Sequence, residues 1–119
     1  MDTAEVIGVG LEIAAAGMGH RWIAVRLGRA EDTVRGWVRR FRRGSEEVRR
    51  FFTVALVALA QDPVMPEPAG SPLADAVAAV DAAHRAAAER WPRMLTVSRW
   101  AFAGRAIRGR VLTCTAAPK

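Results

Sequence analysis

The chain has 119 residues, of which 51% are hydrophobic and 25% charged, and its formal net charge is +6. This length suits one domain with a core of its own, and the hydrophobic share argues against wholesale disorder. The longest apolar run, 51–60, is far shorter than the ~20 residues of a membrane helix. The acidic start, MDTAEVIGVG, does not resemble a secretory signal, so a cytoplasmic location is expected.

The first predicted element is an amphipathic helix over residues 3–16. Val6, Gly10 and Ile13 fall on one stripe of such a helix, whereas Glu5 and Glu12 lie seven residues apart and share a face expected to meet solvent. The sequence Gly-Met-Gly that follows is expected to end the helix.

Two shorter helices are predicted next, over residues 20–27 and 31–42. Gly28 stands where the first of them must end and the chain must turn, a place that favours positive φ. The apolar and small positions of both helices point to one shared core, made of Ile23, Ala24, Leu27, Val34 and Trp37.

A fourth helix, predicted over residues 46–61 with Ser45 as its cap, is apolar around most of its circumference and must be covered on more than one side. Residues 62–71 contain three prolines and a glycine and are interpreted as a linker. Ser71 and Pro72 are typical of a helix start and predict a fifth helix, which extends to about Arg90. A sixth helical segment is predicted over residues 95–107, and the tail from Arg108 is expected to fray.

The predicted architecture is therefore all-α, because no segment has a persuasive strand pattern. Residues 1–44 form a trihelical unit and residues 45–61 an apolar packing helix. The linker covers residues 62–71, and residues 72–119 form a C-terminal helical hairpin with a frayed tail.

Basic residues are concentrated in one part of the chain. Ten of the seventeen arginines lie between Arg21 and Arg50, against four acidic residues in the same segment. A local excess of positive charge suits a polyanion as partner, although a solvated basic face would have the same composition.

The segment GHRWIAVRLGRAEDTVRGWVRRFR resembles the helix-turn-helix of transposase-type, homeodomain-like proteins, and is closest to actinobacterial helix-turn-helix proteins of no settled biological role. The resemblance implies a trihelical fold with the third helix in the major groove of duplex DNA, and hence a nucleoid-associated protein. It places at the DNA surface Ala30, Glu31, Asp32, Arg35, Gly36 and Arg39. Two departures are Arg29, where an apolar residue is common, and Ala30, where a capping serine is common.

The arginines of the segment divide into two predicted roles. Arg35 and Arg39 lie one turn apart and suit either bidentate contacts to guanine or contacts to phosphate. Gly36 between them either lets the helix approach a base closely or is merely tolerated. Phosphate contacts are predicted for Arg21, Arg26, Arg40, Arg42 and Arg43, whereas Arg29 faces either the DNA backbone or solvent.

Histidine, cysteine and tryptophan give no sign of a metal site or a cofactor. His20 is interpreted as a cap or surface residue and His84 as a satisfied core residue, and Cys114 is the one cysteine, so neither a disulfide nor a multi-cysteine zinc site is expected. Trp37, Trp91 and Trp100 are predicted in the core. Trp22 either packs against the fourth helix or marks a partner surface.

The chain is not expected to be an enzyme or to take a small-molecule substrate, because no phosphate loop, nucleophile elbow or cysteine–histidine pair is present. The leading function is duplex DNA binding, as a transcriptional regulator or a mobile-element-associated protein. The alternative is a helical protein–protein interaction module that binds no nucleic acid. Phe51, Phe52, Leu56 and Leu59 are expected to be covered partly within the chain, by the helices after Ser45, and partly across a two-fold homodimer contact.

Overall fold

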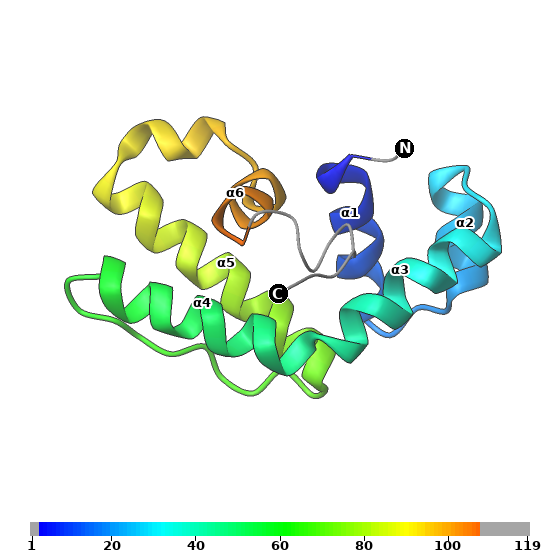
Figure 1. Ribbon diagram of the computed structural model, residues 1–119, viewed down its shortest axis with the longest axis horizontal. Helices are drawn as coiled ribbons and strands as arrows, with labels where there is room; N and C mark the ends of the chain where they lie inside the picture. The colour runs from blue at the N-terminus through cyan, green and yellow to red at the C-terminus, as the bar shows by residue number, and fades with distance from the viewer. Residues whose placement is uncertain (1–2, 108–119) are drawn as a thin grey trace.

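The structure is a computed structural model that describes residues 3–107, and every regular element in this range is a helix (Figure 1). The prediction of an all-α chain is thereby confirmed, and the tail from Arg108, with Cys114, lies outside the described residues. None of the described helices is long and apolar enough to cross a membrane. In chain order the elements are α1 (Ala4–Ala15), α2 (His20–Leu27), α3 (Glu31–Arg43), α4 (Ser45–Leu59), α5 (Pro72–Arg90), the 3-10 helix η1 (Pro92–Thr96) and α6 (Arg99–Ala106).

Helices α1, α2 and α3 pack against one another at one end of the molecule (Figure 1). Thr3 caps α1, because its Oγ1 accepts a hydrogen bond of 3.2 Å from the amide of Val6. Gly28 ends α2 with φ of +68°, as the sequence predicts. Ala30 precedes α3 and offers no side-chain cap, so the acidic first turn of α3 is left to complement the helix dipole.

Helices α3 and α4 follow each other with only Gly44 between them (Figure 1). The prediction that Ser45 caps α4 is wrong, because Ser45 already lies inside the helix and is 1% exposed. Its Oγ donates a hydrogen bond of 2.9 Å to the carbonyl of Phe41, one turn earlier. A serine hydroxyl that donates to the carbonyl four residues earlier has its hydrogen-bonding need met inside the core. Such bonds are often found where a helix bends.

Helices α4 and α5 run side by side in the same direction, because residues 60–71 return along α4 to the end where it began (Figure 1). Ser71 caps α5 as predicted, its Oγ accepting a hydrogen bond of 3.1 Å from the amide of Ala74. Leu56 packs against Ala82 and Ala86. The small side chains of α5 let the two helix backbones approach closely, which is how the mostly apolar α4 is covered on this side.

The predicted helix over residues 95–107 is in fact two elements. Residues Pro92–Thr96 form η1, and α6 begins only after Ser98, whose Oγ accepts a hydrogen bond of 3.0 Å from the amide of Ala101. The break turns the chain so that α6 comes back to lie against both α5 and α1.

Trp100 fastens α6 onto α1. Its ring is 3% exposed and lies directly over Gly8, where a Cβ would overlap the indole. The rings of Phe41 and Trp100 meet in a T-shaped contact, with centroids 6.2 Å apart. Gly8 is therefore required by the close approach of an aromatic side chain that lies 92 positions further along the sequence.

The prediction of a solvent face at Glu5 and Glu12 holds for Glu5, which is exposed, but not for Glu12, which α6 partly covers. Arg99 Nε lies 3.0 Å from Glu12 Oε2, and its Nη1 donates a hydrogen bond of 2.6 Å to Asp81 Oδ1 on α5. Trp100 Nε1 also donates to Glu12, and Ser98 Oγ donates to Glu5 Oε2 at 3.2 Å. This cluster ties α1, α5 and α6 together through polar contacts around the core.

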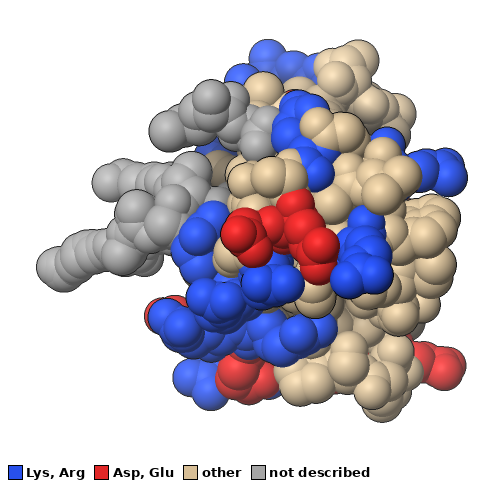
Figure 2. Space-filling view, turned by 90° about the vertical axis from the view of Figure 1, so that its right-hand side faces the viewer, with Lys and Arg blue, Asp and Glu red and all other residues tan. Residues whose placement is uncertain are grey.

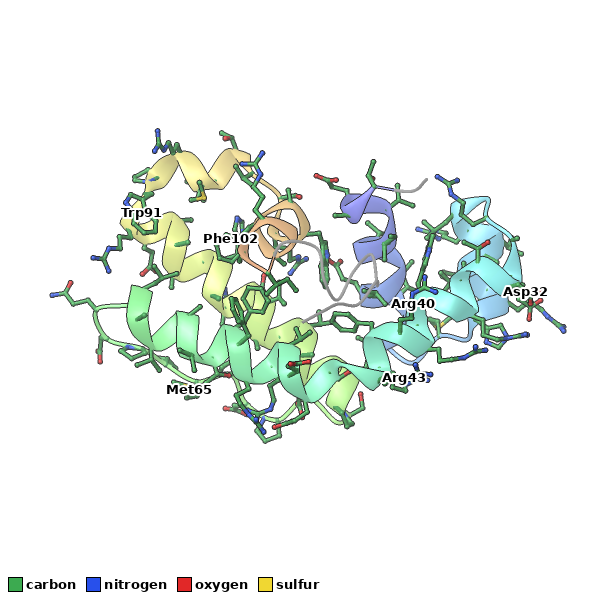
Figure 3. The ribbon with its side chains drawn as sticks, viewed as in Figure 1. Asp32, Arg40, Arg43, Met65, Trp91 and Phe102 are labelled. Carbon is green, nitrogen blue, oxygen red and sulfur yellow. The ribbon has the colours of Figure 1, made fainter. Side chains whose placement is uncertain are left out.

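A single large core joins all six α-helices. Trp37 and Trp100 lie in it as predicted, at 5% and 3% exposure. Trp91 does not, since it is 45% exposed and lies under the guanidinium of Arg90. The break after α5 turns its ring outward, at the end of the molecule opposite α3 (Figure 3).

Candidate nucleic-acid interface

The twelve residues named above as facing DNA all lie on α2, α3 or the turn between them, at one end of the molecule. Figure 2 looks onto this end and shows basic side chains gathered around a small acidic group. The core face of α3 is formed by Val34, Trp37, Val38 and Phe41. Its opposite face is left to solvent, and this is the face that holds the predicted contact residues.

Four arginines in the second half of α3 are exposed and form no ion pair within residues 3–107: Arg39, Arg40, Arg42 and Arg43. Figure 3 shows Arg40 and Arg43 projecting from this helix. Gly36 faces the end of Arg40, whose Nη1 would lie 3.2 Å from an added Cβ. The guanidinium groups in this half of the helix are therefore available to an external anion.

Arg35, in the first half of α3, is held by the protein itself. Its Nη1 donates to Asp32 Oδ1 at 3.1 Å, and its Nη2 donates to Glu31 Oε2 at 3.4 Å. Glu31 also meets α2, because its Oε2 lies 2.9 Å from His20 Nε2 and its Oε1 lies 3.9 Å from Arg21 Nε. Glu31 thus joins the starts of α2 and α3 and neutralises part of their charge.

The remaining two predicted arginines lie on and after α2 and have partners of their own. The guanidinium of Arg26 lies over the ring of Trp22, 5.4 Å from the centroid. Arg29 Nη1 donates to the carbonyl of Leu27 at 3.1 Å. Trp22 is 44% exposed and α2 does not contact α4, so of the two interpretations of Trp22 the packing against the fourth helix is wrong.

A shallow, open hollow of about 450 Å³ lies along one side of α3. Its lining combines the start of α2 with one edge of α3 and consists of His20, Arg35, Val38, Arg39, Arg42 and Arg43. Sequence reasoning placed neither His20 nor Val38 in the candidate site. The sequence predicted that His20 lies at the start of α2. Its contact with Glu31 could not be predicted, because it depends on the angle at which α2 and α3 cross.

The outer face of α4 presents a second exposed surface, which is apolar. Phe51, Val54 and Val57 are 42%, 64% and 52% exposed. The four residues predicted to take part in a dimer contact do not all lie on this surface. Phe52 and Leu56 are 0% and 4% exposed and are buried within the chain. The chain itself therefore covers Phe52 and Leu56, as expected for part of this set, and of the four residues only Phe51, and in part Leu59, remain accessible to a partner.

Neither histidine belongs to a group of potential metal ligands, and residues 3–107 contain no cluster of three or more histidine, cysteine or acidic residues suited to a metal ion. His84 is half-buried, with Nε2 3.1 Å from the carbonyl of Met94 and its ring 5.3 Å from that of Phe102. It is a satisfied residue at the edge of the core, as predicted.

Comparisons with protein-family models, with curated proteins and with solved structures gave no significant match to this chain.

Proposed function

We propose that this protein binds duplex DNA through a helix-turn-helix formed by α2, the turn at Gly28 and α3, with α3 in the major groove. The observation that carries the proposal is the row of exposed arginines on the outer face of α3, which has no acidic partner among the described residues. A phosphate backbone supplies the missing negative charge.

The shape of the surface supports a duplex rather than a single strand. An α-helix is about 10–12 Å wide with its side chains, which matches the ~12 Å width of the major groove. Helix α3 has 13 residues and packs against the core through one face, so most of its outer face beyond the first turn can enter a groove. The aromatic stacking platforms typical of single-strand binders do not occur on this face.

The proposed roles follow from these positions. Helices α1 and α2 support α3 and bring Arg21 and Arg26 toward the DNA backbone. Arg39 is directed at the groove, and Arg43, one turn further along α3, contacts the backbone phosphates. As a DNA-binding protein, the chain would act as a transcriptional regulator or serve a mobile element. The net positive charge of the protein would then raise both its affinity for DNA and its rate of association with DNA.

Fluorescence anisotropy with a labelled pool of random duplexes tests the proposal. The wild-type chain is expected to bind, with an affinity that falls steeply as salt rises, because neutralised phosphates release counterions. The double variant R39Q/R43Q should lose most of this affinity. The matched control is R93Q/R105Q, which removes two exposed arginines outside α3 and should bind almost as well as the wild type. Absence of binding at about 50 mM salt would refute the proposal.

Self-association is a second candidate, and the exposed apolar face of α4 favours it. Phe51, Val54 and Val57 lie on this face without a described neighbour that buries them. The proposal is that two copies meet here. A dimer is compatible with DNA binding, since two recognition helices on one duplex bind more tightly than one.

A further inference from the structure

The hollow beside α3 has two unlike ends. At one end Arg35 and His20 are already engaged with Glu31, at 3.4 and 2.9 Å. Toward the other end Arg42 and Arg43 have no acidic partner among residues 3–107. The cations of one hollow are thus partly neutralised by the chain and partly left for an external anion.

The lining converges on a space suited to one anionic group. Arg35 and Arg42 lie seven residues apart and therefore along one line of α3. His20 faces the same space from the start of α2, and Val38 lies between the two arginines. A phosphate accepts from guanidinium groups with much the same geometry as a carboxylate, and adds further acceptor oxygens.

Glu31 and such a phosphate would require the same donors. If a phosphate enters, Arg35 and His20 turn toward it, and the carboxylate of Glu31 loses two partners while it gains a like charge nearby. Glu31 is 35% exposed, so water can replace those partners. The competition is therefore real but modest, as expected for ion pairs near the surface.

We infer that the hollow formed by His20, Arg35 and Arg42 seats one phosphate group of the duplex backbone, and that Glu31 is an internal competitor for that seat. The inference rests on the proposed DNA binding and deepens it. Glu31 keeps this seat partly closed, because a phosphate must displace its carboxylate from Arg35 and His20. Arg35 is then a phosphate contact, which selects one of the two roles that the sequence allows for it.

The variant E31Q tests this inference, because it keeps the shape of the side chain and removes its charge. The matched control is E46Q, since Glu46 is also an exposed acid paired with arginines, but on α4 and outside the hollow. Hydrogen bonds from Arg49 hold the pKa of Glu46 below its ordinary value, so this control also removes a full charge at neutral pH. Thermal melting followed by circular dichroism verifies that both variants fold.

Binding of the random duplex pool is measured by anisotropy at several salt concentrations. E31Q should bind about twofold to fivefold more tightly than the wild type at about 100 mM salt, with a salt slope steeper by up to about one. E46Q should differ much less. Adding R42Q to E31Q should remove the gain. Equal gains in E31Q and E46Q would mean a general charge effect, and weaker binding by E31Q would mean that Glu31 positions the site or meets DNA; either result overturns the inference.

A second measurement separates the seat from the proposed function. Inorganic phosphate is titrated into the full chain, and the NMR signals of the His20 ring and of the arginine Nε–H groups are followed. Shifts confined to His20, Arg35 and Arg42, stronger in E31Q, support the seat even if no duplex binds. Shifts that are absent, or equal at Arg93 and Arg105, refute the seat even if the duplex does bind.

Discussion

Gly8 shows how one residue without a side chain can be required by a distant part of the chain. A side chain there would overlap the ring of Trp100, which is itself fixed between α1 and α3. Nothing in the local sequence marks Gly8 as special, because the reason for it lies 92 positions away, on α6.

The first prediction concerns this glycine. Gly8→Ala should destabilise the protein by about 1–3 kcal/mol through overpacking, although alanine is favoured over glycine within a helix by roughly 0.5–1 kcal/mol. The measurement is the free energy of unfolding in urea. Gly19→Ala is the control, since Gly19 has open space around it and extended backbone. A Gly8→Ala variant as stable as the wild type would show that α6 does not pack here.

The arginines of α3 allow a second prediction, which separates base reading from backbone holding. Arg39→Ala should relax the sequence preference of the protein as well as weaken its binding, because Arg39 is exposed on α3 and is proposed to enter the groove. Arg42→Ala should weaken binding about equally on all sequences, since its proposed contact is a phosphate. Selection of bound duplexes from a random pool measures both effects. If the two variants select the same sequences with the same strength, Arg39 does not read bases.

Helix α4 is unusual among the helices because several of its large apolar side chains are not covered by any other part of the described chain. The parallel α5 buries Leu56, and the core buries Phe52, but Phe51, Val54 and Val57 stay exposed. The sequence pattern showed that α4 needs cover on more than one side. It did not show which residues the chain itself would cover, because that depends on the direction in which α5 returns.

The third prediction follows from this face. The wild-type chain should self-associate in sedimentation equilibrium at micromolar concentration, and Val54→Glu should make it monomeric without lowering its melting temperature by more than a few degrees. The side chain at position 54 is exposed, so a charge there costs the monomer little. Val64→Glu places the same charge on the linker and should leave self-association unchanged. A wild-type chain that stays monomeric would exclude this use of the surface.

At the scale of the whole molecule, the N-terminal and C-terminal halves share one core. Trp100, Ala103 and Ile107 are buried with residues of α1 and α3, and Arg99 joins Glu12 to Asp81. The three N-terminal helices therefore depend on α6 for part of their cover, and the polar contacts around Glu12 depend on it as well.

The fourth prediction tests this dependence. A chain shortened to residues 1–90 lacks η1 and α6 and exposes the surface of α1 that Trp100 covers. Its thermal unfolding, followed by circular dichroism, should be broad and weakly cooperative, because a substantial part of the core is missing. A melting curve as sharp as that of the full chain, at the same temperature, would show that the N-terminal helices are self-sufficient.

Local chemistry made much of this fold predictable. Gly28, Ser71 and Pro72 mark helix ends by backbone conformation and capping, and the structure places those ends where the sequence predicts them. The errors have separate causes: Glu12 is covered because α6 lies opposite it, Ser45 is inside α4 because only Gly44 separates α3 from α4, and Trp91 turns outward where α5 ends. In the candidate site the arginines could be predicted from the sequence. The contacts of Glu31 with His20 and Arg35 could not, because the contact with His20 depends on how α2 crosses α3.

The contact between α1 and α6 also constrains how the protein is made. Glu12 and Trp100 are 88 residues apart in the chain, so nearly all of the described polypeptide must be synthesised before Gly8 receives its cover. Ribosomes add about 5–20 residues per second, which leaves the apolar surface of α1 bare for several seconds on a nascent chain. The α2–α3 pair, whose contacts are local, can form during that interval. The arginine-bearing surface of α2 and α3 would thus form before α6 packs against α1 and completes the core.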